Sequence, residues 1–264
     1  MGSLPQTQRI WLTGATSGIG LSLARRLLDQ GHRVALSARR QEDLAELAEG
    51  RDNALILPVD ITDRAALLEA AEQIRAHFGG LDMALFNAGT CEYLEARDFD
   101  TALIERVFTT NFTGTLYGIE AALPLLRQAR AEGGQPLLAA TSSAAAYLPL
   151  PRAEAYGASK AALSHFLESL RLDLDQEGIG VSIIHPGFVK TPLTDRNDFA
   201  MPMRIDTETA ADAILRGLAA RRLDIHFPRR FTLMLKLLGI LPPGLRFRLG
   251  RRMSRQNTTG ETTS

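Results

Sequence analysis

Tyr156 and Lys160 stand four residues apart in the sequence AYGASKAAL, and on a helix this spacing places both side chains on one face. Ser143 precedes Tyr156 by thirteen residues, across a proline-containing loop that can return its hydroxyl to the same face. A phenol, an ammonium and a hydroxyl that meet at one point are suited to transferring a proton to or from an oxygen atom. The alternatives are an ordinary surface pair for Tyr156 and Lys160, and Ser142 in the place of Ser143.

A glycine-rich turn, TGATSGIG at residues 13–20, lies between a short apolar run and the helical pattern LSLARRLLDQG. Glycines at 14, 18 and 20 let backbone N–H groups and the N-terminus of the helix approach a pyrophosphate closely. Three glycines are also compatible with a merely structural turn. Their place after the first strand of an alternating series favours a phosphate-binding loop.

The second candidate strand ends in Ala38, Arg39 and Arg40. An acidic residue here would hydrogen-bond the 2′-hydroxyl of an adenosine ribose, whereas an arginine suits a 2′-phosphate. The sequence therefore predicts NADP(H) in preference to NAD(H), with Arg39 as the main contact and Arg40 assisting. The alternative is that both arginines are solvated charges at a strand end.

Short apolar runs alternate with helical patterns along most of the chain. The candidate strands are Arg9–Thr13, Arg33–Ser37, Ala54–Pro58, Met83–Phe86, Pro136–Thr141, Val181–Ile184 and Asp224–Phe227. The candidate helices are residues 18–30, 41–49, 63–78, 99–130, 153–177 and 206–220. This alternation predicts a single α/β domain over residues 1–255, a Rossmann-type, doubly wound parallel sheet of about seven strands with helices on both faces. The polar residues 256–264 are predicted to form a disordered tail.

The composition excludes several classes of protein. The 264 residues carry 30 basic and 30 acidic side chains, so no whole-chain field indicates a nucleic-acid partner. Cys91 is the one cysteine, which excludes an internal disulfide, and no cluster has metal-ligand spacing. Without a signal core or an apolar run long enough to cross a membrane, the expected location is the cytoplasm. We interpret Cys91 as a packing residue.

Seven motifs together resemble the short-chain dehydrogenase/reductase family, in the family's order and over about residues 8–220. They are TGATSGIG at 13–20, Asp60, FNAG at 86–89, Asn111, Ser143, the Tyr156/Lys160 pair and HPGFVKT at 185–191. FNAG stands where the family usually has NNAG, and Thr16 stands where serine is common.

The resemblance implies four catalytic residues. Ser143 would hold the substrate oxygen, and Tyr156 would exchange a proton with it. Lys160 would bind the nicotinamide ribose and lower the pKa of Tyr156, since an ammonium about 4 Å away supplies roughly the 4 kcal/mol that this takes. Asn111 would steady a water molecule that links Lys160 to solvent.

The motifs also imply a set of cofactor-binding residues and no metal site. This set comprises Gly14, Thr16, Ser17, Gly18, Ile19, Gly20, Arg39, Arg40, Asp60, Ile61, Asn87, Ala88, Gly89, Tyr156, Lys160, Pro186, Gly187, Val189 and Thr191. Asp60 has the alternative role of capping the helix that begins near Asp63, and Asn87 that of a turn residue. His185, next to Pro186 and Gly187, is interpreted as structural because the acid/base role is already filled.

The expected function is that of an NADP(H)-dependent oxidoreductase, which transfers a hydride between nicotinamide and a carbonyl or secondary alcohol. The apolar segments 144–155 and 188–205, the second read as a mobile lid, indicate a small hydrophobic substrate. The alternatives are a catalytically silent nucleotide-binding sensor and a membrane-surface interaction protein. By analogy with the family, the subunits are expected to form a homodimer or homotetramer through the long helices.

Residues 229–255 extend beyond the part of the chain that resembles the family. The segment FPRRFTLMLKLLGILPPGLRFRLGRRMSR is apolar and basic by turns. We interpret it as a helical extension that serves as a lid or a dimer contact. The alternative is a basic amphipathic segment that makes a peripheral contact with an anionic membrane.

Overall fold

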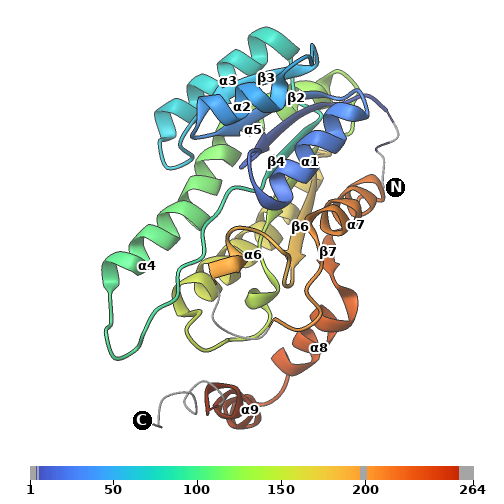
Figure 1. The fold of residues 1–264 in the computed structure, drawn as a ribbon. Coiled ribbons are helices and arrows are strands. Elements are labelled where there is room, and N and C mark those ends of the chain that lie inside the picture. The colour runs from blue at the N-terminus through green and yellow to red at the C-terminus, as the bar shows by residue number, and fades with distance from the viewer. Residues whose placement is uncertain (1–3, 5, 197–200, 256–264) are drawn as a thin grey trace.

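The computed structural model describes residue 4 and residues 6–196 and 201–255, and a seven-stranded parallel sheet runs through it (Figure 1). The strands are β1 (Arg9–Thr13), β2 (Arg33–Ala38), β3 (Ala54–Pro58), β4 (Met83–Phe86), β5 (Leu137–Thr141), β6 (Gly180–Pro186) and β7 (Asp224–Phe227). All seven predicted strands are confirmed. They are short apolar runs without alternation because helices cover both faces of the sheet.

Successive side chains of one strand enter two separate cores, since neighbouring residues of a strand point to opposite faces. In β1, Ile10 and Leu12 enter one core and Trp11 enters the other. The first core is covered by α1 (Gly18–Asp29), α2 (Gln41–Ala48) and α7 (Thr207–Ala219). The second is covered by α3 (Arg64–Phe78), α5 (Gly114–Ala131) and α6 (Glu154–Gln176). The doubly wound α/β fold is thus confirmed.

The strand order, β3-β2-β1-β4-β5-β6-β7, reverses direction between β1 and β4. After β3 the chain crosses over to the other side of β1, so the connections that follow β1 and β4 diverge. In an open parallel sheet, such a reversal leaves a crevice at the carboxyl ends of the strands, where ligands bind. The glycine-rich turn after β1 and the FNAG segment after β4 both lie at this point.

The region predicted as one helix over residues 99–130 is interrupted. The chain forms α4 (Thr101–Phe108), then one π-helical turn (Thr109–Thr113), then α5. Asn111 lies at the centre of the wide turn, with its side chain buried and hydrogen-bonded outside the helix. The prediction of a continuous helix was therefore wrong at this position, and such π-turns are frequent at functional sites.

The predicted helical extension forms two helices, α8 (Arg229–Gly239) and α9 (Pro243–Arg255). They follow β7 and lie at the lower edge of the molecule in Figure 1. A bridge between Val189 and Ile205 closes the base of the 188–205 loop. The middle of this predicted lid, residues 197–200, and the predicted tail, 256–264, lie outside the described residues. Within the described ranges, no helix has the length and apolar character needed to cross a membrane.

Candidate active site

A cavity of about 1080 Å³ opens at the carboxyl ends of β1, β2, β4, β5 and β6. Most residues predicted to contact the cofactor line it: Gly14, Thr16, Ser17, Gly18, Ile19, Arg39, Arg40, Asp60, Ile61, Asn87, Ala88, Gly89, Tyr156, Lys160, Pro186, Gly187, Val189 and Thr191. Gly20, Asn111 and Ser143 are not part of the cavity wall. Each lies beside a residue that is: Gly20 beside Gly14, Asn111 beside Gly89, and Ser143 beside Tyr156. Motif reasoning missed several polar lining residues, although most of them flank a motif: Thr90, Glu92, Glu105, Arg106, Thr109, Thr110 and Thr141.

The glycine-rich turn has the shape of a phosphate cradle. Gly14 and Gly18 adopt φ values of +69° and +52°, a region that residues with a Cβ rarely adopt. A Cβ at Gly20 would lie 1.9 Å from the carbonyl oxygen of Gly14, so only glycine lets α1 begin this close to the turn. Ser17, the N-cap of α1, makes no side-chain hydrogen bond to the helix. The first N–H groups of α1 are therefore available to an anion.

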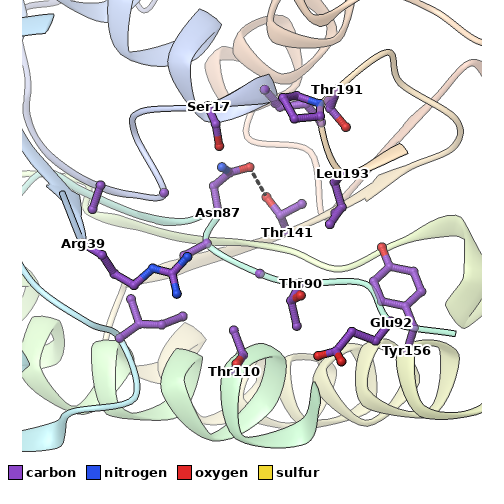
Figure 2. A pocket seen from close by; sticks show the side chains of 18 of the residues that line it. Ser17, Arg39, Asn87, Thr90, Glu92, Thr110, Thr141, Tyr156, Thr191 and Leu193 are labelled. Atoms are coloured by element: carbon purple, nitrogen blue, oxygen red, sulfur yellow. Dashed lines mark hydrogen bonds between the residues drawn. The ribbon is translucent and has the colours of Figure 1, made fainter. Parts of the chain in front are cut away.

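The two arginines after β2 differ in their surroundings. Arg40 forms an ion pair with Asp43 on the first turn of α2. Arg39 makes no hydrogen bond within the described part of the chain, and Figure 2 shows its guanidinium directed into the cavity. Of the two, Arg39 is the cation that is free to meet a phosphate.

Asp60 does not cap the following helix. Asp63 is the N-cap of α3 and accepts a hydrogen bond from the N–H of Ala66. Asp60 instead accepts hydrogen bonds from the N–H and the hydroxyl of Thr62, at 2.9 and 2.8 Å, and lines the cavity. The N–H bond from Thr62 and, to a smaller extent, the charge of Arg39 lower the pKa of Asp60. Its carboxylate is therefore ionised and available beside Arg39.

The FNAG segment is fixed by hydrogen bonds to the neighbouring strands. The hydroxyl of Thr13 accepts bonds from the N–H groups of Asn87 and Ala88, at 3.1 and 3.2 Å. The side-chain oxygen of Asn87 accepts a 3.3 Å bond from the hydroxyl of Thr141, drawn as a dashed line in Figure 2. These bonds hold the segment against the cradle, where a Cβ at Gly14 would lie 2.8 Å from the Cα of Ala88.

Tyr156 and Lys160 meet on one face of α6 at the far end of the cavity from Arg39, as Figure 2 shows for Tyr156. The ammonium of Lys160 lies 6.0 Å from the centroid of the phenol ring. It donates a 2.8 Å hydrogen bond to the carbonyl oxygen of Thr141, at the end of β5. This bond orients Lys160 along the cavity and leaves two of its donors for a ligand.

Burial changes the acid–base properties of both residues. It raises the pKa of Tyr156 well above its usual value, and the adjacent Cys91 adds to this, whereas a hydrogen bond with Ser143 opposes it. Burial also lowers the pKa of Lys160 from 10.5 to about 8. Lys160 is not among the groups that shift the pKa of Tyr156 here, so the expectation that it lowers this pKa stays a prediction. At neutral pH the site holds a protonated phenol, which is a proton donor.

The two adjacent serines have different roles. Ser143 is the one that interacts with the Tyr156 phenol, and its hydroxyl accepts a 3.1 Å bond from the N–H of Ala145. Ser142 donates instead to the carbonyl oxygen of Lys160, at 2.9 Å, and lies 2.8 Å from the hydroxyl of Ser164. Ser142 lines the cavity, but its hydroxyl is engaged with α6, whereas the hydroxyl of Ser143 lies beside the Tyr156 phenol.

Asn111 connects the π-turn to the loop after β4. Its side chain exchanges hydrogen bonds with the backbone of Thr90, accepting at 2.8 Å and donating at 2.9 Å. It also donates a 3.1 Å bond to Ser159 on α6. A Cβ at Gly89 would lie 3.0 Å from the Asn111 oxygen and 3.3 Å from the Lys160 nitrogen. Asn111 thus lies close to Lys160 and braces the backbone beside it.

Cys91 lies close to Tyr156 and Lys160, although the sequence indicated only a packing role for it. In its thiolate form, Cys91 raises the pKa of both Tyr156 and Lys160. Burial raises the pKa of the Cys91 thiol itself, so the thiol stays protonated at neutral pH. The sequence signal was its position two residues after Gly89, which motif reasoning did not use.

A buried polar network connects α6 to the C-terminal helices. His185 lies 3.0 Å from the Ser164 hydroxyl through Nε2 and 2.8 Å from Asp224 through Nδ1. Asp224 also accepts hydrogen bonds from the Tyr147 hydroxyl and from Lys236 on α8. Burial would raise the pKa of Asp224, but the bonds from His185 and Lys236 outweigh it and hold the pKa far below its usual value. His185 does not line the cavity, in agreement with a structural role.

The apolar residues expected to form the substrate wall only partly do so. Leu148, before α6, and Phe188, after β6, pack against Phe231 and Leu235 of α8. Val189 and Leu193 remain as apolar residues in the cavity wall, and Figure 2 shows Leu193 on the Tyr156 side of the cavity. Among the described residues, no group of three or more His, Cys, Asp or Glu side chains could hold a metal ion.

The comparison with known proteins agrees with this geometry. A family model described as short chain dehydrogenase matches residues 8–200. An uncharacterized oxidoreductase of Myxococcus xanthus is 34% identical over 246 residues, which cover 92% of this chain and 96% of that protein. An 11-beta-hydroxysteroid dehydrogenase 1A of Arabidopsis thaliana is 35% identical over 197 residues, which cover 72% of this chain and 55% of that protein.

A solved structure has the same architecture. The Pseudomonas aeruginosa RhlG/NADP active-site complex superposes with a TM-score of 0.78 at 25% identity, covering 87% of this chain and 98% of that one. The family model covers most of the chain, and the strand order, the glycine turn and the Tyr156/Lys160 pair agree with it. The protein is therefore a member of the short-chain dehydrogenase family of oxidoreductases.

Proposed function

We propose that the protein is an NADP(H)-dependent oxidoreductase that interconverts a carbonyl and a secondary alcohol on a small hydrophobic substrate. One observation carries the proposal: Tyr156 and Lys160 line one end of a cavity, with Ser143 beside the phenol, and the same cavity holds the phosphate cradle and, at its far end, Arg39. In this proposal the adenosine of the dinucleotide lies at Arg39 and its nicotinamide at Tyr156.

Each residue has a role that its environment supports. Ser143 holds the carbonyl oxygen of the substrate, and Tyr156, whose pKa is raised by burial, keeps its proton at neutral pH and donates it to that oxygen. Lys160, with a pKa of about 8, is mostly protonated at neutral pH and binds the ribose hydroxyls. When bound, NADPH supplies the hydride. Asn111 holds the backbone after Gly89 in place beside Lys160.

The preference for NADP(H) is supported by Arg39, and the complex of the RhlG relative with NADP agrees with it. A guanidinium that binds a phosphate contributes about 1.5–3 kcal/mol, or roughly ten- to a hundredfold in affinity. Arg39→Ala is therefore expected to weaken the binding of NADPH by at least about tenfold and to change the binding of NADH little. Arg40→Ala is the matched control, since Arg40 is paired with Asp43. If Arg39→Ala weakened both nucleotides equally, the preference would have another origin.

The hydrophobic substrate class is supported by Val189 and Leu193 in the cavity wall and by the resemblance to a protein named as a hydroxysteroid dehydrogenase. A panel of steroid, aryl and acyl ketones would be offered to the protein while NADPH consumption is followed. Tyr156→Phe is expected to lower turnover by roughly 10²–10⁴-fold and to weaken NADPH binding far less than it lowers turnover. Equal turnover by wild type and variant would remove the acid/base assignment. NADPH binding by the wild type without turnover on any ketone would favour a nucleotide-binding sensor.

A homodimer or homotetramer through the long helices α4–α5 and α6 is part of the proposal. Leu172 on α6 supports it, because this large apolar side chain is 71% exposed. Light scattering after gel filtration measures the mass directly. Leu172→Glu is expected to shift an oligomer toward smaller species. A wild-type mass of one subunit at micromolar concentration would contradict this part.

A further inference from the structure

Helix α8 presents an apolar stripe to solvent. Leu233, Met234, Leu237 and Ile240 are exposed on one side of it, with Leu237 at 65% and Ile240 at 81%, and Arg230 stands at the start of the same stripe. Their spacing of three and four residues is that of one helical face. Large apolar side chains exposed in a contiguous group mark an interaction site.

The opposite face of α8 is already used by the fold. Phe231 and Leu235 pack against Ala144 and Leu148, in the loop that follows Ser143. Lys236 reaches inward to Asp224. The outward stripe therefore lies largely outside the packing of the subunit, most of all at Leu237 and Ile240.

Helix α9 continues the exposed apolar surface with Leu245, 45% exposed, and Phe247, 68% exposed. We use the name C-terminal surface for Arg230, Leu233, Met234, Leu237, Ile240, Leu245 and Phe247. Figure 1 shows both helices at one edge of the molecule, with α8 directly after β7.

The sequence of these helices is strongly cationic. Residues 229–255 contain no Asp or Glu and eight basic residues, namely Arg229, Arg230, Lys236, Arg246, Arg248, Arg251, Arg252 and Arg255. The whole chain has 30 basic and 30 acidic residues, so the remainder carries 22 basic against 30 acidic side chains. The excess of basic over acidic residues is therefore confined to residues 229–255, and this net positive charge favours an anionic partner.

A second copy of the chain is a poor occupant of this surface. In a two-fold dimer the same patch meets itself, which would bring two arginine-rich segments together. Like charges placed opposite one another across an interface weaken association. An anionic lipid bilayer, by contrast, offers negative headgroups to the arginines and an apolar layer to the leucines and Phe247.

We propose that the C-terminal surface binds the surface of an anionic lipid bilayer. The contact is peripheral, with the exposed side chains of α8 and α9 entering the boundary between headgroups and acyl chains. The proposal goes beyond the oxidoreductase function and does not depend on it. If both hold, the enzyme meets its hydrophobic substrate at the bilayer, because α8 packs on the loop that carries Ser143.

The first test uses the wild-type protein and sedimentation with vesicles. Vesicles of equal parts phosphatidylglycerol and phosphatidylcholine are expected to bind the protein at low salt, and pure phosphatidylcholine vesicles to bind at least about tenfold less. Raising the salt toward 1 M shortens the Debye length to about 3 Å and should release much of the bound protein. Equal binding to both kinds of vesicle, or no binding to either, would overturn the proposal.

The second test separates the apolar and the charged contributions. Leu237→Ser with Ile240→Ser removes the most exposed apolar side chains of α8 and keeps its charge. Leu223→Ser is the matched control, because Leu223 is 58% exposed before β7, at the other end of that strand from α8. The double variant is expected to lose about tenfold or more in partitioning, and the control to bind like the wild type.

The charge contribution is tested in the same way. Arg246→Gln, Arg248→Gln and Arg251→Gln together should weaken binding to the anionic vesicles by about tenfold or more. The control is a triple variant that loses the same charge elsewhere on the surface and should bind like the wild type: Arg25→Gln, Arg97→Gln and Arg222→Gln.

Two further outcomes would refute the lipid assignment. One is equal weakening by the two triple arginine variants, since charge position would then be irrelevant. The other is self-association of the wild type without vesicles that the Leu237→Ser/Ile240→Ser variant abolishes, since a second copy would then be the occupant. Fluorescence of the buried Trp11 verifies that each variant is folded.

Discussion

Lys160 is the residue at which function and stability oppose one another most directly. Its side chain is buried at 4% exposure, and burial lowers its pKa from 10.5 to about 8. In the unfolded chain the same amine keeps its ordinary pKa, so between these values the unfolded state binds more protons than the folded state. The free energy of unfolding must then rise with pH in this window.

The expected change in the free energy of unfolding follows from the two pKa values of Lys160, unfolded and folded. The difference between 10.5 and about 8 corresponds to about 3 kcal/mol of destabilisation when the lysine is charged. Integrated from about pH 7 to about pH 9.5, Lys160 alone should add about 2 kcal/mol to the free energy of unfolding. Cys91 and Tyr156 act in the opposite direction toward the top of this range, because burial raises the pKa of both groups.

The assay compares the wild type with Lys160→Met in urea at both pH values. Trp11 is the sole tryptophan and is fully buried, so its fluorescence reports global unfolding. The absolute stability of the variant is not the test, since methionine also loses the hydrogen bond to Thr141. The readout is the difference in pH dependence between the two proteins. Loss of the Lys160 charge raises the pKa of Cys91 further, which lowers the stability of the variant at high pH and adds to this difference.

We expect the stability of the wild type to rise with pH by about 2 kcal/mol more than that of Lys160→Met. Lys190→Met is the control, because Lys190 is exposed and should leave the pH dependence unchanged. The same pH dependence in wild type and Lys160→Met would refute the reasoning that Lys160 is held in a destabilising environment.

Two further predictions concern the frame of the site. Gly20→Ala would place a Cβ 1.9 Å from the carbonyl oxygen of Gly14; it should lower stability by about 1–3 kcal/mol and weaken NADPH binding, whereas Gly244→Ala, with open space around it, should do neither. Melting temperatures and nucleotide titrations measure this, and normal nucleotide affinity in the Gly20 variant would contradict the cradle. Asp224→Asn should cost about 1–2 kcal/mol near pH 7, allowing for its partial exposure. The loss should shrink as the pH falls below about 4, because the low pKa of the folded carboxylate stabilises the fold only above that range. A loss independent of pH in urea unfolding would exclude this electrostatic origin.

The fold could be predicted because its signals are local. Each strand is a short run of apolar residues. Because both faces of the sheet are buried, apolar residues do not alternate with polar ones along a strand, and the run is easy to recognise. The glycine turn is equally readable, since its positive φ angles and close approaches require glycine wherever the rest of the chain lies. These features depend on a few consecutive residues and therefore appear in the sequence.

The rest of the site depends on contacts between distant segments. The π-turn at Asn111 exists because its side chain bonds Thr90, and helical periodicity gives no sign of that contact. Cys91 approaches Tyr156 only through the folding of the loop after β4. The ion pair of Arg40 is a different case, because Asp43 stands three residues later and this spacing was visible in the sequence.

Helix α8 links two parts of the molecule that the sequence presents as separate. Its inner face fixes the loop after Ser143, through Phe231 against Leu148 and through Lys236 on the carboxylate that also holds Tyr147. Its outer face is apolar and bordered by arginines. A helix that served only to pack the loop would gain nothing from an exposed leucine stripe, and one that served only as an anchor would not need the half-buried ion pair between Lys236 and Asp224. The two faces together are best explained by a site that must be both rigid and held close to an apolar source of substrate.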